Sequence, residues 1–203
     1  MEERATGLTH SDMPAADAAR CDASLPGREV SEYDTSGDSV PDVRKVFRRV
    51  GDKDSSKVLM VCRETDVNGD GRKDVVRYYT DDGQLLREEV DQNLDGRINQ
   101  VLFFERGRVV RKELDSNGDG KVDTRVFYDK GKPSRRESDP DGRSSAGKWQ
   151  PSRWEYFQKG RVVRVGTDLD GDGRVDRWDR NEALIRAQRD EEDEGVVQDQ
   201  DGS

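Results

Sequence analysis

The sequence predicts an all-β protein in which antiparallel β-hairpins repeat about every 24 residues, with acidic calcium loops along one edge of the sheet. Three features that recur in a fixed order predict this fold. An Asp-rich phrase returns along the chain, a pair of aromatic residues follows it, and a turn with Gly follows the pair. Gly just after an aromatic segment is typical of a β-hairpin. Chained hairpins would form a meander of about ten to twelve strands, or a solenoid.

The composition favours repeats over a single large core. Only 30% of the 203 residues are hydrophobic, 40% are charged, and the formal net charge is −9. A chain of this kind lacks the apolar residues of a large globular core, whereas a repeat buries only a thin layer against its neighbours. The acidic charge argues against nucleic acid as a partner. No stretch approaches the roughly 20 apolar residues of a transmembrane helix.

The repeats are expected to span residues 30–180, after a flexible leader at 1–29 and before an acidic, largely disordered tail at 181–203. The first twenty residues contain no apolar segment typical of a signal peptide. The protein is therefore either cytosolic or exported by a signal that this sequence does not show. Cys21 is a poor lipidation site because Arg20 precedes it. A short capping helix is expected within Arg177–Arg189.

The two cysteines, Cys21 and Cys62, leave two interpretations open. A disulfide between them would fasten the leader to the first repeat in an oxidising compartment. The alternative is a pair of reduced thiols. A zinc site is not expected, because a structural zinc ion needs four ligands.

The Asp-rich phrase occurs in four strong copies and one weaker copy, and places side-chain oxygens at positions 1, 3, 5 and 9 of a nine-residue loop. Ca²⁺ takes about six to eight oxygens at about 2.3–2.6 Å, and a tight loop can converge that many. Ca²⁺ is therefore the expected cofactor, with the position 7 carbonyl as a further ligand; ordinary polar turns are the alternative. The candidate ligands are Asp66, Asn68, Asp70, Arg72 and Asp74; Asp91, Asn93, Asp95, Arg97 and Asn99; Asp115, Asn117, Asp119, Lys121 and Asp123; Asp168, Asp170, Asp172, Arg174 and Asp176; and, in the weaker copy, Asp34, Ser36, Asp38 and Asp42.

These loops are not EF-hands, because an EF-hand carries a bidentate Glu at position 12. Here that position is Arg77, Leu102 or Val126 in the first three strong copies, and the flanks resemble strands. The number of carboxylates in each loop predicts how strongly it binds Ca²⁺. By this count the loop that begins at Asp168 should be the strongest of the four strong copies, and the loop that begins at Asp91 the weakest. A degenerate copy lies near Asp139 and Asp141; its register is ambiguous, since a loop beginning at Glu137 also fits.

The strands carry further columns of residues. The paired aromatic residues point to opposite faces, so both columns pack in the fold or one forms an exposed contact strip. The Arg and Glu columns share a face; an ion-pair lattice is expected, with an anion-binding ladder as the alternative. The columns are Tyr78-Tyr79, Phe103-Phe104, Phe127-Tyr128 and Tyr156-Phe157; Arg87, Arg111, Arg135 and Arg164; and Glu32, Glu64, Glu89, Glu113 and Glu137.

The loops resemble the D-x-[DN]-x-D-G-x-x-D calcium sites of FG-GAP repeats, thrombospondin type 3 repeats and dockerin modules. The dockerin resemblance is partial, because the two dockerin helices have no counterpart. The whole unit, over about residues 30–180, is similar to repeats in exported proteins and lipoproteins of myxobacterium-like bacteria. The resemblance implies calcium binding and leaves the activity open.

The expected function is a calcium-stabilised, non-enzymatic repeat protein of the bacterial envelope or cell surface. It would act as a binding or scaffold module for a polysaccharide or an envelope protein. Export is expected because millimolar calcium sites would stay empty in the cytosol. A structural spacer is the alternative. A carboxylate-dependent glycoside hydrolase is less favoured, because calcium ligation already accounts for most of the carboxylates. The oligomeric state is left open.

Overall fold

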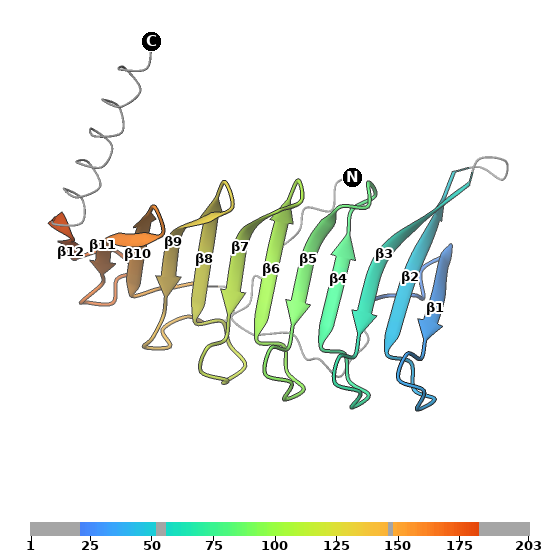
Figure 1. Ribbon diagram of the computed structural model, residues 1–203. Coiled ribbons are helices and arrows are strands. Elements are labelled where there is room, and N and C mark those ends of the chain that lie inside the picture. Colours follow the sequence, from blue (N-terminus) through green and yellow to red (C-terminus); the bar gives the residue numbers. More distant parts are fainter. Residues whose placement is uncertain (1–20, 52–55, 146–147, 183–203) are drawn as a thin grey trace, which may run out of the picture.

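The computed structural model describes residues 21–51, 56–145 and 148–182, which form one open twelve-stranded sheet (Figure 1). The strands follow one another in chain order, and each pairs antiparallel with the next. This confirms the predicted all-β hairpin meander, and the sheet is open rather than solenoidal. The strands are β1 (Arg28–Tyr33), β2 (Val43–Val50), β3 (Lys57–Thr65), β4 (Val75–Tyr79), β5 (Leu85–Val90), β6 (Gln100–Glu105), β7 (Arg108–Leu114), β8 (Thr124–Asp129), β9 (Lys132–Ser138), β10 (Arg153–Gln158), β11 (Arg161–Thr167) and β12 (Arg177–Arg180).

Tight turns join β4 to β5, β6 to β7, β8 to β9 and β10 to β11 along one edge of the sheet, the upper edge in Figure 1. In the turn between β6 and β7, Arg106 and Gly107 have φ values of 50° and 74°. Positive φ at both central residues is the type I′ geometry, whose twist matches that of paired strands. The β8–β9 and β10–β11 turns repeat it. A register shift between Phe103 and Phe104 marks a β-bulge beside this turn.

Arg and aromatic side chains alternate from strand to strand on one face of the sheet, and we call this line the Arg–aromatic row. Arg111 of β7, for example, stands opposite Phe103 of β6 and Phe127 of β8. Its guanidinium lies 4.1 Å from the centre of the Phe103 ring. The same stacking recurs along the row, at 4.4 Å for Arg87 on Tyr78, 4.3 Å for Arg135 on Phe127 and 3.4 Å for Arg164 on Trp178.

The Glu column runs beside this row on the same face, and Glu64, Glu89, Glu113 and Glu137 are buried, whereas Glu32 is exposed. Glu113 is fully buried, and its carboxylate lies 3.0 Å from Nε of Arg125 on the next strand and 3.4 Å from Nε of Arg111 on its own strand. Glu64 pairs with Arg44 at 2.7 Å. The predicted ion-pair lattice is therefore present: Arg87, Arg111 and Arg135 each pair with the Glu two residues further on, whereas Arg164 stacks on Trp178.

The second aromatic column also packs rather than forming an exposed strip. Its members lie at the β-bulges, and all four are half-buried: Tyr79, Phe104, Tyr128 and Phe157. Of the two arrangements that the sequence allowed, the structure has the one in which both columns pack.

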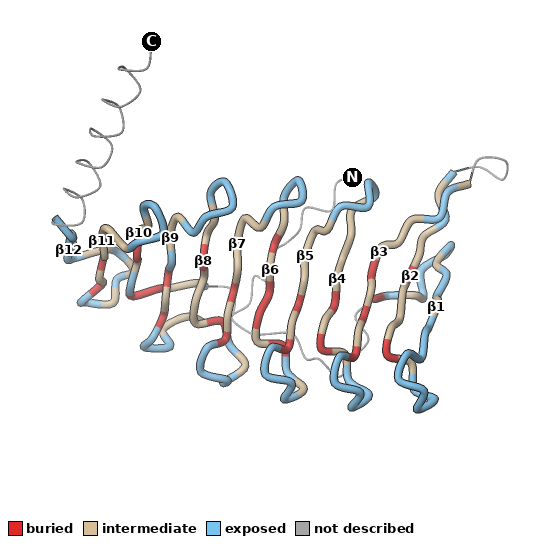
Figure 2. Tube along the Cα trace, viewed as in Figure 1, coloured by how far each residue is buried: buried red, intermediate tan, exposed pale blue. Residues whose placement is uncertain are grey.

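The apolar core is small and lies in the halves of the strands next to the acidic loops (Figure 2). One cluster contains Ile98, Val101 and Phe103. The other contains Val46, Val76 and the Cys21–Cys62 disulfide, whose Cα atoms are 5.6 Å apart. The disulfide expected from the sequence therefore joins the segment before β1 to β3.

Arg177–Arg180 is a strand, so the expectation of a capping helix beginning at Arg177 is wrong there. The segment follows the last acidic loop as β4, β6 and β8 follow theirs, and it pairs with β11. Trp178 stands opposite Gly166, where an added Cβ would lie 2.9 Å from the indole ring. The missing side chain at Gly166 thus makes room for Trp178 at the end of the sheet. The remaining helix residues from 183, the tail and leader residues 1–20 lie outside the described residues.

Candidate metal centre

The acidic loops join each odd-numbered strand to the next along the lower edge of the sheet in Figure 1. Five of them share the nine-residue spacing: 34–42, 66–74, 91–99, 115–123 and 168–176. The connection between β9 and β10 carries the insertion instead. Because the strands pair in order, successive loops are neighbours along this edge.

The first Asp of each loop organises the backbone. Asp66 accepts hydrogen bonds from the N–H of Gly69 at 2.7 Å and of Gly71 at 2.8 Å, one on each carboxylate oxygen. Both glycines have positive φ, 75° and 86°, a conformation that side chains other than Gly disfavour. The sequence therefore folds the loop around Asp66. The same pair of bonds recurs at Asp115 and Asp168, at Asp34 with Ser39 in place of the second Gly, and at Asp91 with Leu94 in place of the first Gly.

The last residue closes the loop with one oxygen and leaves the other free in the loop that ends at Asp74. Oδ2 of Asp74 accepts the N–H groups of Val67 at 2.6 Å and Asn68 at 3.3 Å. Oδ1 has no hydrogen-bond partner, although Asp74 is only 1% exposed. Burial, followed by repulsion from Asp66 and Asp70, raises the pKa of this carboxyl group in spite of the two backbone hydrogen bonds. An ionised carboxylate here needs a partner that the protein does not supply.

Two other loops bring three carboxylates together. Ligand oxygens of Asp168, Asp170 and Asp176 all lie within 4.8 Å of one another, as do those of the weaker copy, Asp34, Asp38 and Asp42. In the loop that begins at Asp168, both oxygens of that residue already accept backbone N–H groups, and together with Arg143 these bonds lower its pKa against the effect of burial. The carboxylate is therefore held in its charged form.

The side chains at positions 3 and 5 also fold the loops. Asp70 accepts the N–H of Arg72 at 2.8 Å, and Asn68 accepts the N–H of Asp70 at 3.0 Å. Equivalent bonds are accepted by Asp119, Asn117, Asp172 and Asp170. The predicted ligand side chains thus converge on the same short loop, and the position 7 residues are held by their N–H groups.

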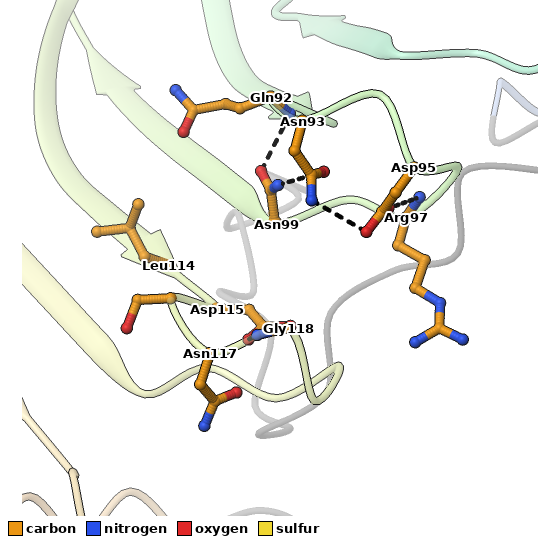
Figure 3. A pocket seen from close by; sticks show the side chains of 10 residues that line it. Gln92, Asn93, Asp95, Arg97, Asn99, Leu114, Asp115, Asn117 and Gly118 are labelled. Carbon is orange, nitrogen blue, oxygen red and sulfur yellow. Dashed lines mark hydrogen bonds between the residues drawn. The ribbon is translucent and has the colours of Figure 1, made fainter.

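The loop from Asp91 to Asn99 is built differently, as Figure 3 shows. Oδ1 of Asn99 accepts the N–H of Gln92 at 3.1 Å, and Nδ2 of Asn99 donates to Oδ1 of Asn93 at 2.9 Å. Nδ2 of Asn93 in turn donates to Asp95 at 3.0 Å. Three of the side chains predicted to bind a cation are therefore bonded to one another, beside a hollow that opens towards the next loop.

Arg143 is a functional candidate that sequence reasoning missed. In the β9–β10 connection, Asp139 accepts the N–H groups of Arg143 and Ser144, which makes Asp139 rather than Glu137 the loop origin. The Arg143 guanidinium then reaches Asp168 of the following loop at 3.2 Å. No spacing rule predicts this contact, because it depends on which loop follows the insertion. Within the described part of the chain, no helix is long and apolar enough to cross a membrane.

No protein-family model matches this sequence, and no curated protein matches it. Several solved structures are similar to part of this chain. Accessory secretory proteins 1, 2 and 3 of Streptococcus pneumoniae give a TM-score of 0.40 at 16% identity over 62% of this chain, and a GtfA/B complex gives 0.38 at 18% over 55%. A mutant of S. aureus TarM, in complex with Fondaparinux, alpha-GlcNAc-glycerol and UDP, gives 0.40 at 11% over 53%. The match covers 20–21% of each of those chains, so this chain spans about a fifth of their length.

These comparisons contradict the function expected from the sequence, a non-enzymatic calcium-stabilised repeat protein of the envelope. The structural neighbours are glycosyltransferases, which are enzymes. We therefore withdraw that function, together with its scaffold and spacer variants. The similarity covers 53–62% of this chain and assigns no activity to it.

Proposed function

We propose that the acidic edge of the sheet binds divalent cations, Ca²⁺ in particular, and that bound cations fix the loops against the strands they join. The observation that carries the proposal is the buried Oδ1 of Asp74, which has no hydrogen-bond partner. An unpartnered buried charge is costly, whereas a metal ion is a partner that compensates it. The proposal concerns this edge alone and leaves any activity of the whole protein open.

The chemistry of the loops favours Ca²⁺. The side-chain ligands are carboxylate or amide oxygens, with one hydroxyl oxygen at Ser36, and such oxygens suit hard cations rather than zinc or copper. Ca²⁺ accepts irregular shells of about six to eight oxygens, whereas Mg²⁺ demands a smaller, near-octahedral shell. In the loop that begins at Asp66, three carboxylates lie on one nine-residue turn, so the loop is highly charged for its size. A divalent ion would offset the mutual repulsion that acts on Asp74.

The expected energetic effect is modest for each loop. For a site with a dissociation constant near 0.1 mM at about 1 mM free Ca²⁺, binding adds roughly 1.4 kcal/mol to the free energy of unfolding. Several occupied loops would therefore change the stability of a small sheet substantially. This is consistent with a fold whose apolar core is small.

Replacing Asp74 with Asn tests the proposal. The Asn oxygen can still accept the N–H of Val67, but the atom that replaces Oδ1 becomes a donor. We expect Asp74→Asn to remove one Ca²⁺ site in isothermal titration calorimetry. In EDTA the variant should be at least as stable as the wild type, because a buried charge without a partner is gone.

The matched control is Asp129→Asn, which removes an exposed carboxylate from the end of β8, away from the acidic edge. It should leave the number of Ca²⁺ sites and their affinities unchanged. Wild-type protein that takes up no Ca²⁺ at millimolar concentration would refute the proposal. So would an Asp74→Asn protein that binds the same number of ions as the wild type.

A further inference from the structure

The acidic loops share one backbone requirement, which orients the side chain at position 9. The N–H of the second loop residue always donates to an oxygen of the ninth: Val67 to Asp74 at 2.6 Å, for example, and Gln92 to Asn99 at 3.1 Å. The same bond is present at Asp42, Asp123 and Asp176. Since this bond fixes one terminal atom of the ninth side chain, the other terminal atom is fixed as well.

The other terminal atom is an oxygen in the loops that end in Asp, where that of Asp123 accepts the Ser116 hydroxyl at 2.9 Å, and an NH₂ group in the loop that ends in Asn99. In the first case the atom is an acceptor, as Oδ1 of Asp74 is. In the second it is a donor, and it already has a partner in Oδ1 of Asn93. A hydrogen-bond donor cannot ligate a cation. Figure 3 shows the resulting chain of bonds from Gln92 through Asn99 and Asn93 to Asp95.

Rotating the side-chain amide of Asn99 by 180° would point its oxygen at a cation only at the cost of hydrogen bonds. Its oxygen would then face the interior of the loop, but its NH₂ group would face the N–H of Gln92. Two donors would then oppose each other, and the hydrogen bonds from Gln92 to Asn99 and from Asn99 to Asn93 would both be lost. The orientation that the backbone selects is therefore the one that excludes the ion.

Two further features of this loop agree with closure by hydrogen bonds. In the loop that begins at Asp66, Oδ1 of Asn68 accepts the N–H of Asp70. The equivalent oxygen of Asn93 accepts the NH₂ group of Asn99 instead. In addition, the guanidinium of Arg72, from the preceding loop, lies directly over Gly96, where a Cβ would contact it. A fixed positive charge beside the loop opposes the entry of a second cation.

We propose that Asn99 makes the loop from Asp91 to Asn99 a metal-independent closure, and that cation binding is restricted to the loops that end in Asp. The closure by Asn99 does not depend on the proposed function. Only the statement that the loops ending in Asp bind cations rests on it. The side-chain amides take over the role that the ion has in the other loops, so the middle of the acidic edge stays ordered at any cation concentration. Asn99 is thus a specificity-determining residue, which departs from the expectation that Asn93 and Asn99 are neutral ligands.

The number of Ca²⁺ ions bound by three variants, measured by isothermal titration calorimetry, shows which loops hold a cation. Asp123→Asn, in the next loop, should lose one site. Asp95→Asn should lose none, because its loop holds no ion. Asn99→Asp should gain one site, although the nearby Arg72 would weaken that site at least about threefold relative to the loop that ends in Asp123. Loss of a site in Asp95→Asn, or no gain in Asn99→Asp while Asp123→Asn loses one, would overturn the assignment.

Hydrogen exchange in EDTA tests the closure without any cation. The backbone N–H of Gln92 and the side-chain NH₂ of Asn99 should be protected, and adding Ca²⁺ should not change their exchange rates. The N–H of Val67 should exchange more slowly once Ca²⁺ is present. Unprotected Gln92 and Asn99 groups would overturn the closure by themselves. If they are protected and no loop responds to Ca²⁺, the proposed function fails and the closure stands.

Discussion

Two buried carboxylates, one in the strands and one in the loops, show how differently the two regions handle charge. Glu113 is 0% exposed in the sheet, and Asp74 is 1% exposed at the acidic edge. Burial raises the pKa of both. At Glu113, the charges of Arg125 and Arg111 oppose this rise, whereas at Asp74 the charges of Asp66 and Asp70 add to it. Glu113 thus has counter-charges beside it in the sheet, whereas Asp74 has like charges beside it at the edge. Removal of a cation should therefore act on the edge and leave the strands alone.

Removal of the cation should have the largest effect. Four loops end in Asp, and at about 1.4 kcal/mol each they would lose roughly 5–6 kcal/mol of unfolding free energy when EDTA replaces 1 mM Ca²⁺. Urea unfolding in Ca²⁺, Mg²⁺ and EDTA measures this, with the Mg²⁺ midpoint expected close to that in EDTA. Three coincident curves would remove the distinction between edge and strands. The four loops end at Asp42, Asp74, Asp123 and Asp176.

Phe103→Ala should instead destabilise the strands. Phe103 is 5% exposed, packs with Ile98 and Val101, and lies under the guanidinium of Arg111. Its removal should lower the free energy of unfolding by about 3–5 kcal/mol. Because the cluster contains no cation site, the loss should be equal in Ca²⁺ and in EDTA.

The matched control for that variant is Leu169→Ala. Leu169 is 61% exposed in the last acidic loop, so its truncation should change stability by no more than about 0.5 kcal/mol. If the Phe103→Ala loss doubled in EDTA, the strands and the loops would form one cooperative unit rather than two regions.

The features that repeat could be predicted from the sequence, because each repeat carries the same residue types at the same spacing and therefore adopts the same local structure. Gly at turn and loop positions, the alternation of Arg111 and Glu113, and the aromatic pairs placed the strands, the turns and the shared face. A bulge follows Phe103, so that Phe103 and Phe104 stand opposite Arg111 and Val109, two residues apart on β7. That bulge depends on the turn geometry and is not visible in a strict period of two.

Features found in a single repeat could not be predicted in the same way. Trp149, in the insertion, donates to Glu137 and stacks with Arg125, which lies 4.2 Å from its ring centre. Gly166 replaces the Glu of the other repeats and receives Trp178. Each depends on a neighbour that the repeat pattern does not contain. The orientation of Asn99 is similar, since only its backbone partner shows that the amide presents a donor.

The smallest effect should come from Glu113→Gln, and its sign distinguishes the two regions further. Because burial raises the pKa of Glu113, the folded state takes up a proton more readily than the unfolded state. That contribution to stability is complete below the unfolded pKa and is lost as the pH rises through the folded pKa. Gln mimics the protonated form, so the variant should be as stable as the wild type near pH 4 and about 1 kcal/mol more stable at pH 7.

Urea unfolding at the two pH values measures this difference. Glu29→Gln is the control, because Glu29 pairs with Arg49 in an ion pair whose two side chains are 48–51% exposed. Removing that pair should cost no more than about 1 kcal/mol and should show no such pH dependence near neutrality. A large loss in Glu113→Gln at pH 7 would mean that Arg111 and Arg125 outweigh burial. The lattice would then stabilise the sheet through its charges, and the Arg–aromatic row would not be held by packing alone.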